Sequence, residues 1–212
     1  MWSIFKKRKY DDAGIKYLRY FEEKSLADQA KARFIVLDTE TTGLNTKKDV
    51  ILSIGAVAVS ESRLKVNDSF EIYLNQPHYK PETAAIHGIL KEGKMETVEP
   101  ERGLKLFLEY IKGDFIVAHH AAFDLEMLNR ALEKENLPPL KNKVIDTGNL
   151  YRKLPLSKSQ HISLDELAEK FAVPLQDRHT ASGDAYITAI IFLKILSRLR
   201  SKSGFEPNDL FG

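Results

Sequence analysis

Short apolar segments occur first as a block and then in alternation with helical patterns, and this order constrains the fold of the 212-residue chain more than any other feature. Residues 33–37, 50–59 and 63–74 are predicted strands, the third of which lies at a sheet edge or in a hairpin. A block of strands that precedes strand–helix alternation favours a mixed α/β sheet flanked by helices.

Two further strands are predicted at residues 114–118 and 143–145. Apolar residues that recur every three or four positions predict four helices, at residues 101–112, 121–136, 164–171 and 182–199. Ser163 is followed three residues later by Glu166, which is the spacing of a capping box and marks the start of the third helix.

Both ends of the chain differ from its body. Residues 1–32 are predicted to form a basic helical extension, because the first 20 residues carry six Lys or Arg against two Asp and residues 10–32 are partly amphipathic. The basic run at residues 6–9 is expected to be a solvated arm. Residues 33–200 form the predicted domain, and residues 201–212 form a predicted polar tail.

The composition limits the class of protein. Hydrophobic residues make up 43% of the chain and charged residues 29%, which is typical of a soluble globular domain. No apolar run approaches the ~20 residues that a membrane span needs, so no membrane partner is expected. The absence of cysteine excludes disulfides and thiolate metal sites and suits a reducing compartment, so a cytoplasmic location is expected.

Two carboxylates stand two residues apart at the end of the first predicted strand. Because alternate residues of a strand point the same way, Asp38 and Glu40 project to one side. Adjacent carboxylates repel each other, so a cation is their natural partner, and hard oxygen ligands suit Mg²⁺ or Mn²⁺. Taken alone, this pair is equally compatible with a solvated loop at the end of a strand.

Further polar residues occur at the starts of two predicted helices. Asp124 lies near the start of the helix at residues 121–136, and Asp184 opens the last predicted helix, five residues after His179. Each of them alone is more often a helix cap, a dipole partner or a surface residue. Their occurrence together and in this order favours a shared catalytic site.

Three segments resemble the motifs of the DEDDh (DnaQ-like) 3′→5′ exonucleases, which include the proofreading exonuclease of the DNA polymerase III epsilon type. They are Asp-Thr-Glu-Thr-Thr-Gly at residues 38–43, Ala-His-His-Ala-Ala-Phe-Asp at residues 118–124 and His-Thr-Ala-Ser-Gly-Asp-Ala at residues 179–185. The resemblance implies an RNase H-like fold with a mixed five-stranded sheet. It also implies a metal-dependent hydrolase that releases nucleoside monophosphates from nucleic-acid 3′ ends.

The resemblance assigns roles to five residues of these motifs. Two divalent cations, Mg²⁺ or Mn²⁺, would be held by the carboxylates of Asp38, Glu40, Asp124 and Asp184. Asp38 would bridge both ions, and His179 resembles the general base that activates water. The sister DEDDy group has tyrosine four residues before the last Asp, where this chain has Thr180.

The resemblance also implies a set of contacts to the 3′-terminal nucleotide. The residues concerned are Thr41, Gly43, Leu44, Glu82, Ile86, His87 and Phe123. For Phe123, a place in the core is an equally good interpretation. The second motif departs from the family pattern, because His120 stands where asparagine is usual, which affects substrate positioning and leaves the metal ligands in place. Asp146 is interpreted as a supporting or structural residue.

Several functions share this chemistry. DNA is the preferred substrate in our interpretation, in proofreading or repair, and an RNA or oligoribonucleotide 3′ exonuclease is the alternative. A non-catalytic nucleic-acid-binding module is a further alternative, although all five catalytic positions are present. A DNA polymerase or a sliding clamp is a possible partner, since residues 207–211 faintly resemble Leu-Phe-ended clamp-binding peptides. A disordered terminus is the preferred interpretation of that segment.

Overall fold

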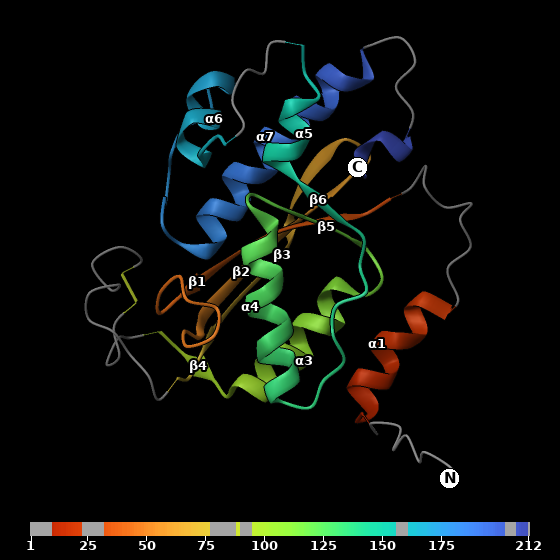
Figure 1. Cartoon of the computed structure of the whole chain (residues 1–212), viewed down its shortest axis with the longest axis vertical. Coiled ribbons are helices and arrows are strands. Elements are labelled where there is room, and N and C mark those ends of the chain that lie inside the picture. The colour runs from red at the N-terminus through yellow and green to blue at the C-terminus, as the bar shows by residue number, and fades with distance from the viewer. Residues whose placement is uncertain are drawn as a thin grey trace.

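The computed structural model shows a sheet with helices packed on both of its faces, which confirms the predicted mixed α/β architecture (Figure 1). The structure describes residues 10–22, 32–76, 88–89, 95–155, 161–201 and 207–211. Within these residues, no helix is long and apolar enough to cross a membrane.

The sheet has six strands in the order β4-β3-β2-β1-β5-β6. They are β1 (Phe34–Thr41), β2 (Ile51–Ser60), β3 (Arg63–Leu74), β4 (Thr97–Val98), β5 (Phe115–Ala118) and β6 (Val144–Asp146). β1 is central and pairs antiparallel with β2 and parallel with β5. The expected number of five strands was wrong by one, because β4 has only two residues and two residues carry no detectable periodicity.

β1 is longer than its apolar run. The strand continues past Leu37 to Thr41, because β2 pairs with it along its whole length, from Phe34 opposite Val59 to Thr41 opposite Ile51. Asp38 and Glu40 therefore lie inside a paired strand, whose alternation fixes the direction of both side chains.

The helices follow the predicted pattern in most places. They are α1 (Asp12–Glu22), α3 (Pro100–Ile111), α4 (Ala121–Lys134), α5 (Thr147–Arg152), α6 (Leu164–Phe171), α7 (Ala181–Arg200) and the 3₁₀ turn η2 (Pro207–Leu210). α6 begins where the capping box predicts, since Ser163 N donates to Glu166 Oε2 at 2.8 Å and Glu166 N donates to Ser163 Oγ at 3.2 Å. α5 was not predicted, because six residues are too few to show a helical period.

The side chains of β1 alternate between two apolar cores. Phe34 and Val36 pack with α5, α6 and α7, whereas Ile35 and Leu37 pack with α1, α3 and α4. The central strand is thus covered on both faces, and only its C-terminal end, which carries the carboxylates, is polar.

The described part of the N-terminal extension packs on the domain. Tyr17 of α1 is 1% exposed, and its hydroxyl donates to Asn142 Oδ1 at 2.6 Å and accepts from Lys141 N at 2.8 Å. Asn142 in turn donates to the carbonyl oxygens of Lys112 and Asp114. Of the predicted helix at 10–32, the structure describes residues 10–22, where α1 lies, and residue 32, which is not helical; the basic segment at residues 6–9 lies outside the described residues.

The end of the chain also packs on the body. Leu210 is 7% exposed, and the ring of Phe211 lies 5.0 Å from that of Phe115 and 5.1 Å from Lys143 Nζ. The preferred interpretation of a disordered terminus was therefore wrong for residues 207–211, because two apolar side chains gain burial there. A clamp could bind Leu210 and Phe211 only after they leave this packing.

We predict that Tyr17→Phe lowers the free energy of unfolding by roughly 1–3 kcal/mol, because it leaves Asn142 Oδ1 and Lys141 N without their buried partner. Urea denaturation would measure the change. The matched control is Tyr186→Phe, at a side chain that is 43% exposed, which should change the value by less than ~0.5 kcal/mol. Equal effects of the two substitutions would contradict a role for α1 in holding the domain.

Candidate active site

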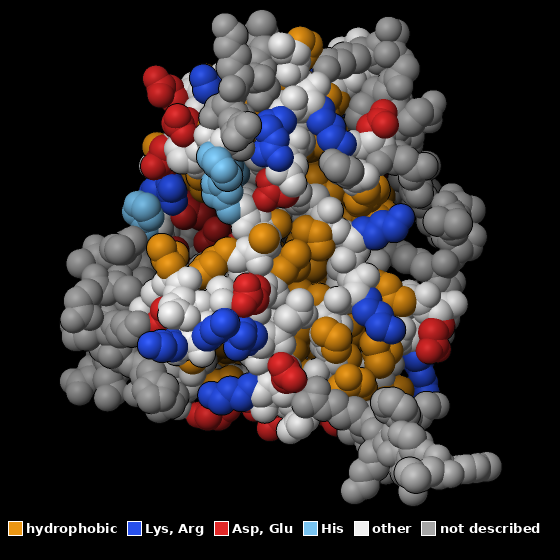
Figure 2. Space-filling view, in the orientation of Figure 1, with side chains coloured by type: hydrophobic (Ala, Val, Ile, Leu, Met, Phe, Trp, Pro, Cys, Tyr) orange, Lys and Arg blue, Asp and Glu red, His pale blue; other side chains and the backbone are white. Residues whose placement is uncertain are grey.

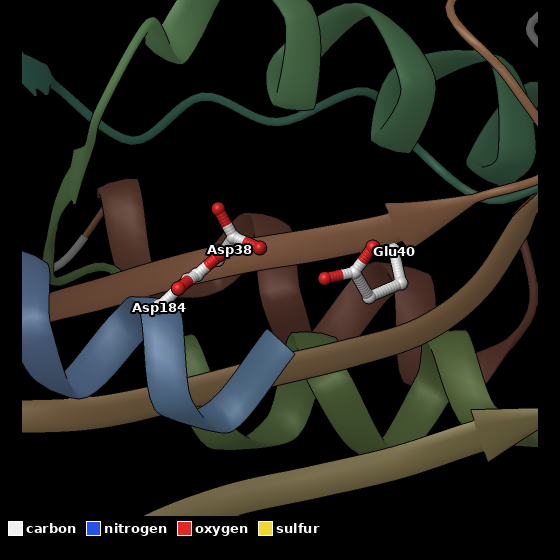
Figure 3. Close-up of side chains that lie close together, drawn as sticks. All are labelled: Asp38, Glu40 and Asp184. Atoms are coloured by element: carbon white, nitrogen blue, oxygen red, sulfur yellow. The ribbon is translucent and has the colours of Figure 1, made fainter. Parts of the chain in front are cut away.

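Carboxylates from two distant parts of the chain meet at the C-terminal end of β1. One carboxylate oxygen each of Asp38, Glu40 and Asp184 lies within 4.8 Å of the others. Figure 3 shows Asp38 and Glu40 on the central strand and Asp184 on α7, whose first turn carries that residue. The structure thus brings together three of the four carboxylates for which metal binding was predicted.

A glycine allows this meeting. Gly55 of β2 is the register partner of Asp38, and a Cβ on Gly55 would lie 2.2 Å from Ser182 N and 2.3 Å from Ala181 C. The backbone of the first turn of α7 therefore lies directly on β2, closer than any side chain would permit. Thr180 caps this helix by accepting from Gly183 N at 3.1 Å, and Asp184 follows one residue later.

Asp124 is buried beside this group but is bound differently. Its Oδ1 accepts from Thr39 N at 3.1 Å and from Thr39 Oγ1 at 2.7 Å, and the residue is 4% exposed. These bonds tie α4 to β1. Asp124 also raises the pKa of Asp38, so the two carboxylates interact although Asp124 is not among the three whose oxygens lie within 4.8 Å.

Burial makes the charges of these carboxylates costly. Burial first, and then the neighbouring charges of Asp124, Asp184 and Glu40, raise the pKa of Asp38 well above its ordinary value. Burial and Asp184 raise the pKa of Glu40 to about 8, and burial raises the pKa of Asp124 to about 7 against the lowering effect of the Thr39 hydrogen bonds. Such a cluster gains stability from a bound cation.

A second observation supports the fit of these residues to a divalent cation. Asp184 Oδ1 is buried and receives no hydrogen bond from the described part of the chain, so Asp184 keeps one oxygen available to a ligand. All donors are carboxylates, which are the ligands that Mg²⁺ and Mn²⁺ prefer. Figure 2 shows acidic side chains in a shaded hollow of this face, with histidine side chains near it.

His179 lies on the loop that leads into α7. Its backbone is left-handed, with φ of 64°, and its side chain is exposed. Burial, the largest effect, raises the pKa of Asp184, whereas the nearby guanidinium of Arg178, the imidazole of His179 and the His179 backbone N–H lower it. The imidazole is therefore adjacent to the carboxylate cluster and accessible from solvent.

The residues predicted to contact substrate have different environments. Leu44 is 85% exposed, which is unusual for a large apolar side chain and fits contact with a nucleotide. Thr41 is buried and donates to Gly43 O at 2.8 Å, and a Cβ on Gly43 would lie 2.6 Å from Asp49 Oδ2, so this loop is tightly packed. Phe123 is half-buried and packs against the core of α1, α3 and α4.

Three other predicted substrate residues, Glu82, Ile86 and His87, lie outside the described residues. Their contact with the nucleotide stays a prediction.

The backbone conformation at position 120 explains why histidine can stand where the family usually has asparagine. Its φ of 57° and ψ of 42° are left-handed, a conformation in which Asn and His are both enriched, so the replacement of one by the other keeps the turn before α4. Asp146 holds the same region, because its two oxygens accept from Ala121 N and Asn149 N at 2.8 Å. It thereby connects the starts of α4 and α5, which agrees with its structural interpretation.

The sequence reasoning gave no role to two side chains in this region, His119 of the second motif and Arg178. His119 lies 2.9 Å from Thr147 Oγ1 through Nδ1, and burial lowers its pKa to about 4, so it is neutral. Arg178 contacts Asp184 and Asp165. The only available signal for Arg178 was a cation immediately before His179, and spacing alone could not show where its side chain points.

Comparison with known proteins gives one family. A family model described as "Exonuclease" matches residues 35–192. The curated proteins that the chain resembles include "DNA polymerase III PolC-type" of Caldanaerobacter subterraneus subsp. tengcongensis, 36% identical over 94% of this chain, and that of Staphylococcus haemolyticus, 33% identical over 86%. The chain spans only 14% and 13% of these relatives.

Solved structures share the fold. E. coli exonuclease I with a dT13 oligonucleotide matches with a TM-score of 0.69 at 15% identity, over 80% of this chain and 42% of that one. Exonuclease X with 5′ overhanging duplex DNA matches with a TM-score of 0.62 at 24% identity, over 84% of this chain and 96% of that one. The nuclease domain of 3′hExo, a DEDDh family member bound to rAMP, matches with a TM-score of 0.69 at 17% identity, over 81% of this chain and 94% of that one. The chain therefore has the RNase H-like exonuclease fold that was predicted.

We predict that Gly55→Ala lowers the free energy of unfolding by roughly 1–3 kcal/mol and weakens Mn²⁺ binding, because a methyl group cannot fit under the first turn of α7 and Asp184 moves with that turn. Urea denaturation and calorimetric titration would measure the two effects. Gly113→Ala is the control for Mn²⁺ binding, since a Cβ at Gly113 would lie 3.1 Å from Tyr20 Cβ of α1 and meet none of the clustered carboxylates. Wild-type Mn²⁺ affinity in Gly55→Ala would contradict the proposed role of this contact.

Proposed function

The chain belongs to the exonuclease family, and on this premise we propose that it is a metal-dependent enzyme that removes nucleotides one at a time from nucleic-acid 3′ ends. The observation that carries the proposal is the meeting of Asp38, Glu40 and Asp184 within 4.8 Å beside the exposed His179. The 3′→5′ direction rests on the resemblance of the three motifs to those of the DEDDh enzymes.

The carboxylates of the cluster would hold the ions. Asp38 is central to the group, since it interacts with Asp124, Asp184 and Glu40, and in this proposal it would contribute to holding both ions. Two divalent ions held there would orient the scissile phosphate, activate water and stabilise the leaving oxygen. Asp124 keeps its place through Thr39, so the ligand set joins β1, α4 and α7 into one rigid frame.

His179 would accept the proton of the attacking water. Its exposed ring lies on the loop before α7 and is open to solvent, and in this proposal it faces the substrate phosphate. A general base must be close to the ions without being a ligand, and the position of His179 next to Asp184 meets that condition.

The substrate we propose is DNA. The curated relatives are PolC-type DNA polymerases, and two of the structural neighbours were solved with DNA. The exposed Leu44, four residues after Glu40 in the chain, would contact a terminal base without reading its sequence. RNA is the second candidate, because 3′hExo was solved with rAMP. A polymerase is the partner that the PolC-type relatives suggest, in a proofreading role.

Digestion of end-labelled oligonucleotides would test the reaction. Single-stranded DNA, duplex DNA with a mismatched 3′ end and RNA would each be labelled at the 5′ or the 3′ end and incubated with Mg²⁺, Mn²⁺ or EDTA. We expect 5′-labelled ladders that shorten from the 3′ end, immediate release of a 3′ label as mononucleotide, and no cleavage in EDTA. Binding of the oligonucleotides without cleavage would favour the non-catalytic module.

We predict that His179→Ala lowers kcat by roughly 10²–10⁴, as expected for loss of a general base, while Mn²⁺ affinity and stability stay at wild-type values. Single-turnover cleavage and calorimetric titration would measure the two effects. His161→Ala, at an exposed histidine outside the three motifs, is the control. Normal turnover of His179→Ala would refute the assigned role.

We predict that Asp38→Asn abolishes metal-dependent cleavage and stabilises the protein in EDTA, because it removes a buried charge from among three others. The raised pKa values make the folded state bind more protons than the unfolded state between the ordinary value near 4 and about 8. The stability of the wild type in EDTA should therefore fall as pH rises through this window, and that of Asp38→Asn should fall less. Thermal denaturation at several pH values would measure the stability of both proteins. A steeper fall of stability with rising pH in Asp38→Asn than in the wild type would contradict the electrostatic account.

A further inference from the structure

We propose that Arg178 is a positioning residue that fixes Asp184 for the divalent ion and fixes the loop that carries His179. The inference rests on the proposed function, because it concerns the same site. Nothing in the three motifs assigns a role to Arg178, which stands immediately before the third motif.

The guanidinium of Arg178 connects the first turns of two helices. Its Nε donates to Asp165 Oδ1 of α6 at 2.6 Å, and its Nη1 donates to Asp184 Oδ2 of α7. The Arg178 side chain is 22% exposed and that of Asp184 is 7% exposed, whereas Asp165 is 54% exposed. The bridge thus runs from a solvent-facing carboxylate to a buried one.

The two oxygens of Asp184 have different roles as a result. Oδ2 receives the Arg178 hydrogen bond, and Oδ1 is buried and receives none from the described residues. A carboxylate that is bonded through one oxygen cannot rotate freely, so Arg178 fixes the direction of the Asp184 carboxylate, one oxygen of which lies within 4.8 Å of oxygens of Asp38 and Glu40. Partners that orient a ligand in this way typically change metal affinity by 10–100-fold when they are removed.

The same bridge holds the loop before α7. Nη1 of Arg178 lies 3.5 Å from Nδ1 of His179, whose backbone is left-handed with φ of 64°. The ion pair with Asp165 anchors the loop to α6, which is itself fixed by its capping box. Arg178 therefore couples the metal ligand Asp184 to the proposed base His179.

Lysine cannot replace this geometry. An ammonium group is a single point charge, whereas the planar guanidinium presents separate N–H groups to Asp165 and Asp184 at the same time. Arg178→Lys therefore keeps the charge and loses the two-sided bridge, and Arg178→Gln loses both.

The test is Mn²⁺ titration by calorimetry, without substrate, together with single-turnover cleavage at saturating Mn²⁺. We expect both Arg178→Gln and Arg178→Lys to bind Mn²⁺ about tenfold more weakly and to turn over at least about tenfold more slowly at saturation. Asp165→Asn should change both quantities in the same direction, and the double variant Arg178→Gln with Asp165→Asn should be no worse than Arg178→Gln alone. Arg130→Gln, which removes an exposed ion pair with Glu126, is the matched control and should match the wild type.

Three outcomes would overturn the inference. Tighter Mn²⁺ binding by Arg178→Gln would show that Arg178 acts only as a competing positive charge. Wild-type behaviour of Arg178→Lys would show that charge alone suffices, and additive effects in the double variant would show that Asp165 does not act through Arg178. If Arg178→Gln does not fold, as circular dichroism would reveal, Asp165→Asn and Arg178→Lys carry the test.

The titration also separates this inference from the proposed function. A wild-type chain that binds Mn²⁺ but cleaves no substrate would refute the exonuclease proposal and leave the affinity comparison intact. A wild-type enzyme that cleaves, with variants of unchanged Mn²⁺ affinity and turnover, would refute only the role of Arg178.

Discussion

The site depends on the contact between the first turn of α7 and Gly55 of β2. Because Gly55 has no side chain, the backbone of Ala181 and Ser182 lies directly on the sheet beside Asp38. This contact brings Asp184 to within 4.8 Å of carboxylates that precede it by almost 150 positions in the chain. The two apolar cores hold β1 and α7 in place, and the glycine sets their separation.

The cost of this arrangement is electrostatic. Burial and mutual repulsion raise the pKa values of Asp38, Glu40, Asp124 and Asp184, so their ionised forms oppose folding in the absence of a cation. Part of the opposition is offset by hydrogen bonds from Thr39 to Asp124 and from Arg178 to Asp184. The same bonds fix the direction of the carboxylates, so the groups that make the cluster tolerable also shape it for binding.

Local patterns predicted most of the sheet and the longer helices. The alternation in β3 and the capping box of α6 gave their bounds correctly, because both signals lie within a few neighbouring residues. β4 and α5 were missed because they are too short to show a period. The packing of residues 207–211 on the domain was missed because Leu210 and Phe211 gain burial only against Phe115 and other distant residues.

The sequence by itself determined which chemistry is available: the identity and order of the acidic residues and of His179, and a mixed α/β fold in which β1 carries the first two of them. The tertiary structure alone decided which carboxylates meet, that Asp124 is held by Thr39, and that Arg178 joins Asp165 to Asp184. The physical reason is that residue type and periodicity are local properties, whereas proximity, burial and the resulting pKa values come from contacts between elements that are far apart in the chain.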